Sequence, residues 1–124
     1  MFDHINIGVS DYAKSKAFFL KALKPLGVEK GPEGEPSYGI ELYGRNDASF
    51  CLHQTTVRPA PLHIAFVAES RDEVKAFYRA ALDAGGEDNG APGLRPQYSG
   101  KYYAAFVIGP DGHNIEAVFH ESEG

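Results

Sequence analysis

Two histidines at matching points of an internal repeat are the residues best suited to chemistry in this chain. Residues 4–27 align with residues 63–86 without a gap, at an offset of 59, and eight of the 24 aligned positions are identical. The first identical pair is His4 and His63. If the two halves pack about a pseudo-two-fold axis, the imidazoles can converge, and imidazole is a common ligand of divalent metals. Alternatively, each histidine is a surface or hydrogen-bonded residue.

A carboxylate that completes such a site is found near the end of the chain. Glu116 stands in the middle of an expected strand, between the apolar residues Ile115 and Ala117. A buried carboxylate without a partner is costly, and a metal ion would compensate its charge. The pattern therefore favours a metal site made by His4, His63 and Glu116. The alternative is an edge strand that leaves Glu116 in water.

The elements expected to position these residues repeat in the same order. In each half an alternating segment leads into a helical pattern that stops at Gly27 or at Gly86. Four further strands are expected at 37–43, 48–53, 101–108 and 113–119, and the stretches 29–36 and 87–100 each have room for one more. Each half thus reads β-α-β-β-β. We predict an α+β fold in a single domain over residues 1–124, with module one at about 1–54 and module two at about 62–120.

Composition narrows the range of partners and compartments. The 124 residues carry a net charge of −5 without any run of like charges, so neither nucleic acid nor a membrane surface is an expected partner. Cys51 is the single cysteine, which excludes an intrachain disulfide and fits a reducing compartment. The alternation begins at the first residues and leaves no room for a signal peptide. We expect a cytoplasmic protein.

Three blocks of sequence resemble the glyoxalase, bleomycin-resistance and extradiol dioxygenase (vicinal oxygen chelate) superfamily. They are DHINIGVSD at 3–11, LHIAF at 62–66 and GPDGHNIE at 109–116. The resemblance implies paired βαβββ modules that form a curved sheet around a central cavity. It also implies that His4, His63 and Glu116 bind a divalent metal ion (Zn, Ni, Fe or Mn), and that the protein is a homodimer, as such folds often pair and sometimes exchange modules.

The chain departs from the glyoxalase I pattern at a fourth metal position. That enzyme uses Glu or Gln on the last strand of its first module, whereas the nearest residues here are Cys51 and His53. We therefore expect a glyoxalase-like metal-dependent lyase or isomerase that acts on a small oxygen-chelating substrate, with Glu116 as the catalytic carboxylate. Glu41 is a weaker candidate for the base. One alternative is an Fe(II)-dependent dioxygenase, because two histidines and one carboxylate also suit non-haem iron. A second is a non-catalytic, ligand-sequestering protein like the bleomycin-resistance proteins.

A cluster of aromatic and basic residues precedes and begins the penultimate strand. Arg95 with Tyr98, Tyr102 and Tyr103 could form a mouth for a flat anionic substrate, because arginine pairs with carboxylates in a fork. The alternative is an ordered surface loop with tyrosine side chains packed on it. Two further histidines, His113 after a turn and His120 near the terminus, are expected to be solvated.

Overall fold

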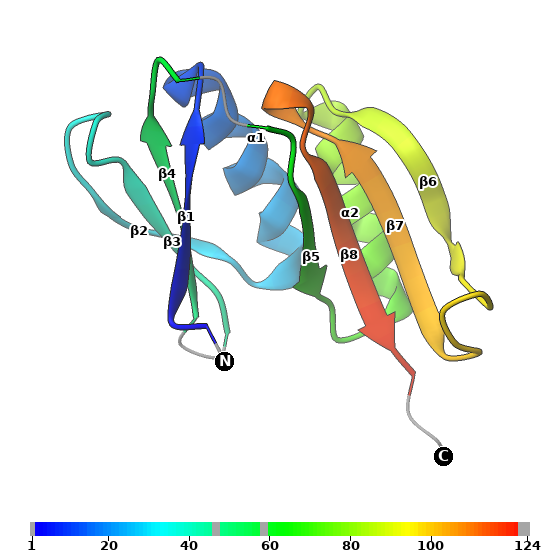
Figure 1. Ribbon diagram of the computed structural model, residues 1–124. Coiled ribbons are helices and arrows are strands. Elements are labelled where there is room, and N and C mark those ends of the chain that lie inside the picture. Colours follow the sequence, from blue (N-terminus) through cyan, green and yellow to red (C-terminus); the bar gives the residue numbers. More distant parts are fainter. Residues whose placement is uncertain (1, 46–47, 58–59, 122–124) are drawn as a thin grey trace.

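The computed structural model describes residues 2–45, 48–57 and 60–121 and contains the expected repeat of elements (Figure 1). Module one consists of β1 (His4–Val9), α1 (Tyr12–Leu23), the short 3-10 helix η1 (Lys24–Leu26), β2 (Glu29–Glu33), β3 (Ile40–Tyr43) and β4 (Ser49–Gln54). Module two consists of β5 (His63–Val67), α2 (Arg71–Asp83), β6 (Glu87–Leu94), β7 (Tyr102–Ile108), the 3-10 helix η2 (Pro110–Gly112) and β8 (Asn114–His120). The prediction of two tandem βαβββ modules is confirmed.

Each module forms its own four-stranded sheet with the same strand order. The orders are β1-β4-β3-β2 and β5-β8-β7-β6, and in both sheets the first and last strands of the module are parallel. The eight described strands therefore make two sheets rather than one continuous curved sheet. As a consequence, β1 and β5 each stand at the edge of a sheet, with one side unpaired among the described residues.

Local capping explains where the two helices begin. The Asp11 side chain accepts a hydrogen bond from Lys14 N–H at the start of α1, and the Ser70 hydroxyl accepts one from Glu73 N–H at the start of α2. Module one then turns at Gly27, whose φ of 78° lies in the left-handed region that favours glycine. Neither helix nor any other helix of the described residues is long and apolar enough to cross a membrane.

The core lies between the sheets, where the two helices pack against each other and against the strands (Figure 1). Aromatic rings connect the two halves: Phe19 contacts Phe50 at 5.1 Å between centroids, and Phe50 contacts Phe66 of module two at 5.3 Å. Burial of such rings is the main driving force for docking the modules. The other face of each sheet points away from the helices and is called the outer face below.

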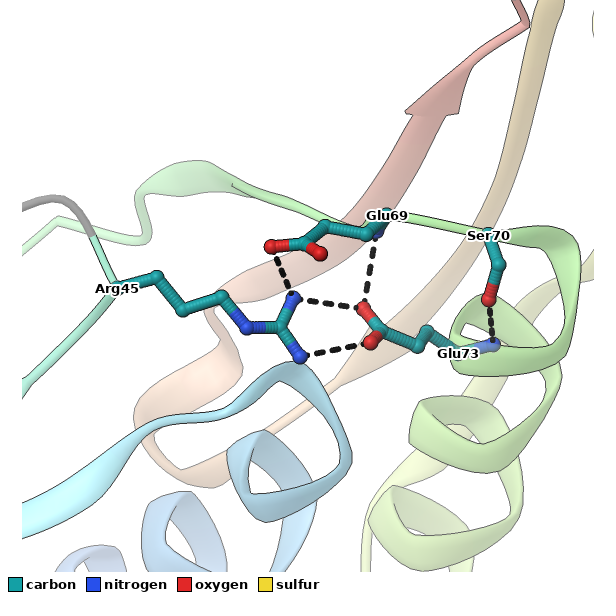
Figure 2. A network of polar contacts seen from close by, with 4 residues as sticks. All are labelled: Arg45, Glu69, Ser70 and Glu73. Atoms are coloured by element: carbon teal, nitrogen blue, oxygen red, sulfur yellow. Dashed lines mark hydrogen bonds and ion pairs between the residues drawn. The ribbon is translucent and has the colours of Figure 1, made fainter.

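Each of the two hairpin turns makes a polar contact with the opposite module. In the turn after β3, the Arg45 guanidinium donates to both oxygens of Glu73, at 3.0 and 2.7 Å, and pairs with Glu69 at 3.0 Å (Figure 2). In the turn after β7, the Asp111 carboxylate accepts bonds from the backbone N–H and the hydroxyl of Ser10. Glu69 and Ser10 are counterparts in the repeat, so the two contacts are related by the pseudo-symmetry of the modules.

Candidate functional site

The outer face of module two brings one histidine and one acidic side chain together. Strands β5 and β8 are parallel, and their register pairs Ala65 with Glu116. His63 Nε2 then lies 2.7 Å from Glu116 Oε1, a hydrogen-bonding distance. The His63 side chain is 54% exposed, whereas that of Glu116 is only 2% exposed. A buried carboxylate therefore stands next to an imidazole that solvent can still reach.

The second oxygen of Glu116 has a different partner. The Tyr102 hydroxyl on β7 donates to Glu116 Oε2. Burial and then the adjacent Glu116 carboxylate raise the pKa of Tyr102 to about 12, so its hydroxyl remains a proton donor near neutral pH. The Tyr102 ring is held edge-on by Tyr98 at 4.9 Å and by His120 at 5.1 Å. Both oxygens of Glu116 are thus occupied by polar neighbours.

Apolar side chains surround this polar pair. Ala104, Phe106 and Val118 form a small buried cluster on the outer face, separate from the main core. The Arg95 guanidinium lies 5.3 Å above the Phe106 ring and donates to the carbonyl oxygens of Ala91 and Gly93. Arg95 therefore stabilises the irregular end of β6, and the Phe106 ring beneath it lies 6.0 Å from the His63 ring.

The outer face of module one carries hydrogen-bonded pairs that are more exposed. His4 Nδ1 lies 2.7 Å from Asp3 Oδ1, and the His4 side chain is 58% exposed. On β4, His53 Nδ1 lies 2.7 Å from Asn6 Oδ1. Cys51 is paired with Asn6 in the β1–β4 register, just as Glu116 is paired with Ala65. Cys51 therefore occupies in module one the position that Glu116 occupies in module two.

Cys51 has acidic and aromatic neighbours on this face. Burial, followed by the charge of Glu41 on β3, raises the pKa of the Cys51 thiol, which disfavours the thiolate. Glu41 accepts a hydrogen bond from the Tyr43 hydroxyl at 3.3 Å. A thiol kept protonated is a poor metal ligand unless a metal displaces its proton.

The structure unites some of the predicted residues and separates others. His63 and Glu116 meet, while His4 contacts Asp3, and within the described residues of one chain no three His, Cys, Asp or Glu side chains are grouped to hold a metal. Tyr102 shares the outer face with Glu116. Tyr103 lies on the opposite face of β7, 5% exposed beneath the Arg71 guanidinium, so it does not share the mouth around Arg95.

The expectation that His113 is solvated is wrong. Its side chain is fully buried, and Nδ1 accepts a hydrogen bond from Leu62 N–H at 2.9 Å. Burial lowers the pKa of His113, which keeps the ring neutral. Its position after a turn suggested exposure, and no local pattern revealed that the backbone of Leu62, just before β5, hydrogen-bonds to it. His120, by contrast, is exposed as expected.

The donors on module two fit a divalent metal ion. An imidazole nitrogen and a carboxylate oxygen are the ligand types that zinc, nickel and iron accept, and here they already point at each other. The buried Glu116 carboxylate also favours a cation nearby, because a buried charge is costly unless it is paired. His63 and Glu116 would therefore hold the ion.

Comparison with protein families identifies the class. Residues 1–117 match the model of the Glyoxalase/Bleomycin resistance protein/Dioxygenase superfamily. Because this match covers nearly the whole chain, the protein belongs to that superfamily. Comparison with curated proteins finds no match.

Solved structures show the same fold over the full length. A glyoxalase/bleomycin resistance protein from Albidiferax ferrireducens T118 is 30% identical, with a TM-score of 0.80 and coverage of 97% of this chain and 99% of that one. A glyoxalase-related enzyme from Fulvimarina pelagi is 21% identical, with a TM-score of 0.73 over 97% and 88% of the chains. The oxidase ChaP-H2 is 21% identical, with a TM-score of 0.69 over 100% and 96% of the chains. The last two likenesses concern the fold alone.

Proposed function

We propose that this protein is a metal-dependent lyase or isomerase whose site is shared between two copies of the chain. In this proposal His63 and Glu116 bind the metal together with His4 of the partner subunit. The observation that carries it is the contact between His63 and the buried Glu116 carboxylate on the outer face of module two. The substrate class is a small molecule that offers two neighbouring oxygens.

The exposed edges of the two sheets support a shared site. His4 lies on β1 and His63 lies on β5, and each of these strands has an unpaired edge among the described residues. Unpaired edge strands readily accept a strand from another chain. Pairing β1 of one copy with β5 of another would place their outer faces side by side. In that arrangement His4 of the partner subunit would lie near His63 and Glu116.

The chain's own groups account for positioning and for control of the environment. When bound, a divalent metal would supply Lewis acidity that stabilises the negative charge of an enediolate-like species. Ala104, Phe106 and Val118 exclude water from one side of Glu116, which strengthens electrostatic interactions there. Glu116 is the proposed catalytic carboxylate, and transfer of a proton to Oε2 would require that atom to release the Tyr102 hydroxyl.

The donor set also favours a second candidate function, an Fe(II)-dependent dioxygenase. Because Cys51 stands where a second carboxylate would complete a four-ligand site, the set is two histidines and one carboxylate. This combination is typical of non-haem iron oxygenases. Metal identity in protein purified without chelators, with oxygen consumption measured on loaded protein, separates the two candidates.

Mixing two inactive variants tests the shared site. We expect His4→Ala and Glu116→Ala to lose metal separately, because each removes one donor from every site. When the two are unfolded together and refolded, mixed dimers would contain one intact site, and about a quarter of all sites would regain metal with random pairing. No regain in demonstrated mixed dimers would contradict a shared site. A parent that binds no metal, with His4→Ala/His63→Ala keeping its affinity for a small ligand, would instead indicate ligand sequestration.

A further inference from the structure

We infer that Tyr102 is a positioning residue that reserves one oxygen of Glu116 for the metal. This inference rests on the proposed function, because it concerns the same donor pair. The Tyr102 hydroxyl donates to Glu116 Oε2, while Oε1 faces His63 Nε2 at 2.7 Å. The two oxygens therefore have separate tasks. Oε2 is held by the Tyr102 hydroxyl. Oε1 faces His63 and remains available to the metal.

The strand register shows that this contact depends on how the Tyr102 side chain runs along the sheet. The residue opposite Glu116 on β7 is Phe106, and the residue opposite Tyr102 on β8 is His120. Tyr102 therefore reaches Glu116 diagonally, along the outer face, rather than directly across the ladder. A phenol is long enough to make this contact, whereas a shorter hydroxyl at the same position would not reach.

Neighbouring rings fix the direction of the phenol. Tyr98 packs against the Tyr102 ring at 61° and His120 packs against it at 89°, so the ring is held from two sides. Edge-to-face contacts of this kind are favourable beyond the area that they bury. Tyr102 therefore presents its hydroxyl to Glu116 without having to lose much side-chain freedom when a ligand binds.

This role differs from contact with substrate. A tyrosine that only lined the mouth would leave metal affinity unchanged, whereas a tyrosine that orients a ligating carboxylate would affect it. Partners that orient metal ligands typically contribute 10- to 100-fold in metal affinity. Without the Tyr102 hydroxyl, Oε2 would be free to turn towards the metal, and Glu116 would bind through two oxygens instead of one.

The test compares Tyr102→Phe with Tyr98→Phe in the full chain. Tyr98 belongs to the same ring cluster but makes no hydrogen bond to Glu116 among the described residues, and both changes remove one hydroxyl. We expect Zn²⁺ and Ni²⁺ to bind Tyr102→Phe about 10- to 100-fold more weakly in titrations against a chromophoric chelator. Tyr98→Phe should bind them like the parent. X-ray absorption of the nickel-loaded proteins should show an additional carboxylate oxygen only in Tyr102→Phe.

Each outcome assigns the failure to a different claim. If the parent binds metal and Tyr102→Phe matches it in both affinity and coordination, the positioning role is wrong and the proposed metal site stands. If the parent binds neither ion, the proposed function fails and this inference fails with it. Thermal unfolding of the metal-free proteins provides the folding control. Tyr102→Phe keeps the ring contacts but leaves Glu116 Oε2 without its donor, so we expect a cooperative transition at a lower Tm than that of the parent.

Discussion

The two outer faces are built on the same repeat, yet they carry different chemistry. On module two, His63, Glu116 and Tyr102 converge around a buried carboxylate. On module one, His4 and His53 form separate pairs with Asp3 and Asn6, both near solvent. The fold therefore supplies equivalent positions, and the residue type at a few of them decides which face can hold a charge. The decisive difference is Glu116 against its counterpart Cys51.

The largest expected effect is the difference in metal binding between a variant without the Glu116 side chain and one without its counterpart, Cys51. Glu116→Ala should abolish stoichiometric metal binding, because it removes the only buried carboxylate of the described outer faces. Cys51→Ala should retain the metal, since burial and Glu41 keep that thiol protonated. Elemental analysis of both purified variants checks the comparison. Equal loss in the two would show that the modules contribute equally to the site.

The next effect concerns the glycines that end the two halves of the repeat. A Cβ at Gly86 would lie 2.4 Å from Val107 Cγ1 and 2.9 Å from the Ala81 carbonyl oxygen, so Gly86→Ala must displace the core. We expect a loss of about 1–3 kcal/mol in the free energy of unfolding, measured by chemical denaturation. Gly100→Ala is the matched control, because no atom lies within 4 Å of the added methyl group.

Gly27, the counterpart of Gly86, should respond for another reason. Its added Cβ would meet Arg45 Nε at 2.4 Å, at the far end of a flexible side chain, while φ at 78° is itself unfavourable for alanine. Gly27→Ala should therefore cost about 1 kcal/mol from the backbone, and it should also displace the Arg45 contact with module two. A larger loss of unfolding free energy for Gly27→Ala than for Gly86→Ala would contradict the expectation that core displacement costs more than the backbone conformation.

A smaller effect is expected on the pH dependence of stability, to which the hairpin turn of module two should contribute and that of module one should not. His113 in module two is buried and neutral with a lowered pKa, whereas its counterpart in module one is Ala48, which cannot titrate. Unfolded His113 takes up a proton near its ordinary pKa of about 6.5, and the folded side chain does so only at lower pH. The free energy of unfolding should therefore fall as pH drops below about 6.5.

His113→Asn tests the source of this pH dependence. Asparagine can still accept the hydrogen bond from Leu62 N–H but cannot be protonated. Denaturation curves at pH 8, 7 and 5.5 should show a shallower decline for the variant than for the parent. An unchanged decline would assign the pH dependence to other groups.

The smallest effect is expected at the contact between the module-one turn and α2. Arg45 and Glu73 form an ion pair (Figure 2). The hydrogen bonds that Arg45 donates lower the pKa of Glu73. Arg45→Ala should lower Tm slightly, and high salt should reduce the difference from the parent. Arg79→Ala, on the exposed side of α2, is the control. A Tm change equal to that of the control would show that the Arg45 contact adds nothing to the docking of the modules.

Much of the architecture was predictable because it depends on local patterns. Alternation, capping residues and glycine stops predicted both helices and the order of the strands. The expected bounds of β3, β4, β7 and β8 lie within about three residues of the observed ones. The strand parity predicted that Glu116 faces away from Ile115 and Ala117. The contacts of Arg45 with Glu73 and of Asp111 with Ser10 had no such signal, because they join residues 28 and 101 positions apart whose approach depends on the docked modules.

By itself the sequence determined the repeat, the two modules, and the equivalence of His4 with His63, because these follow from periodicity along one strand or helix. Only the tertiary structure decided which donors meet. Glu116 reaches His63 because β5 and β8 lie parallel in one sheet, while His4 stands on the other sheet. Contacts across separate elements depend on packing of the whole chain, and no pattern within a single element specifies them.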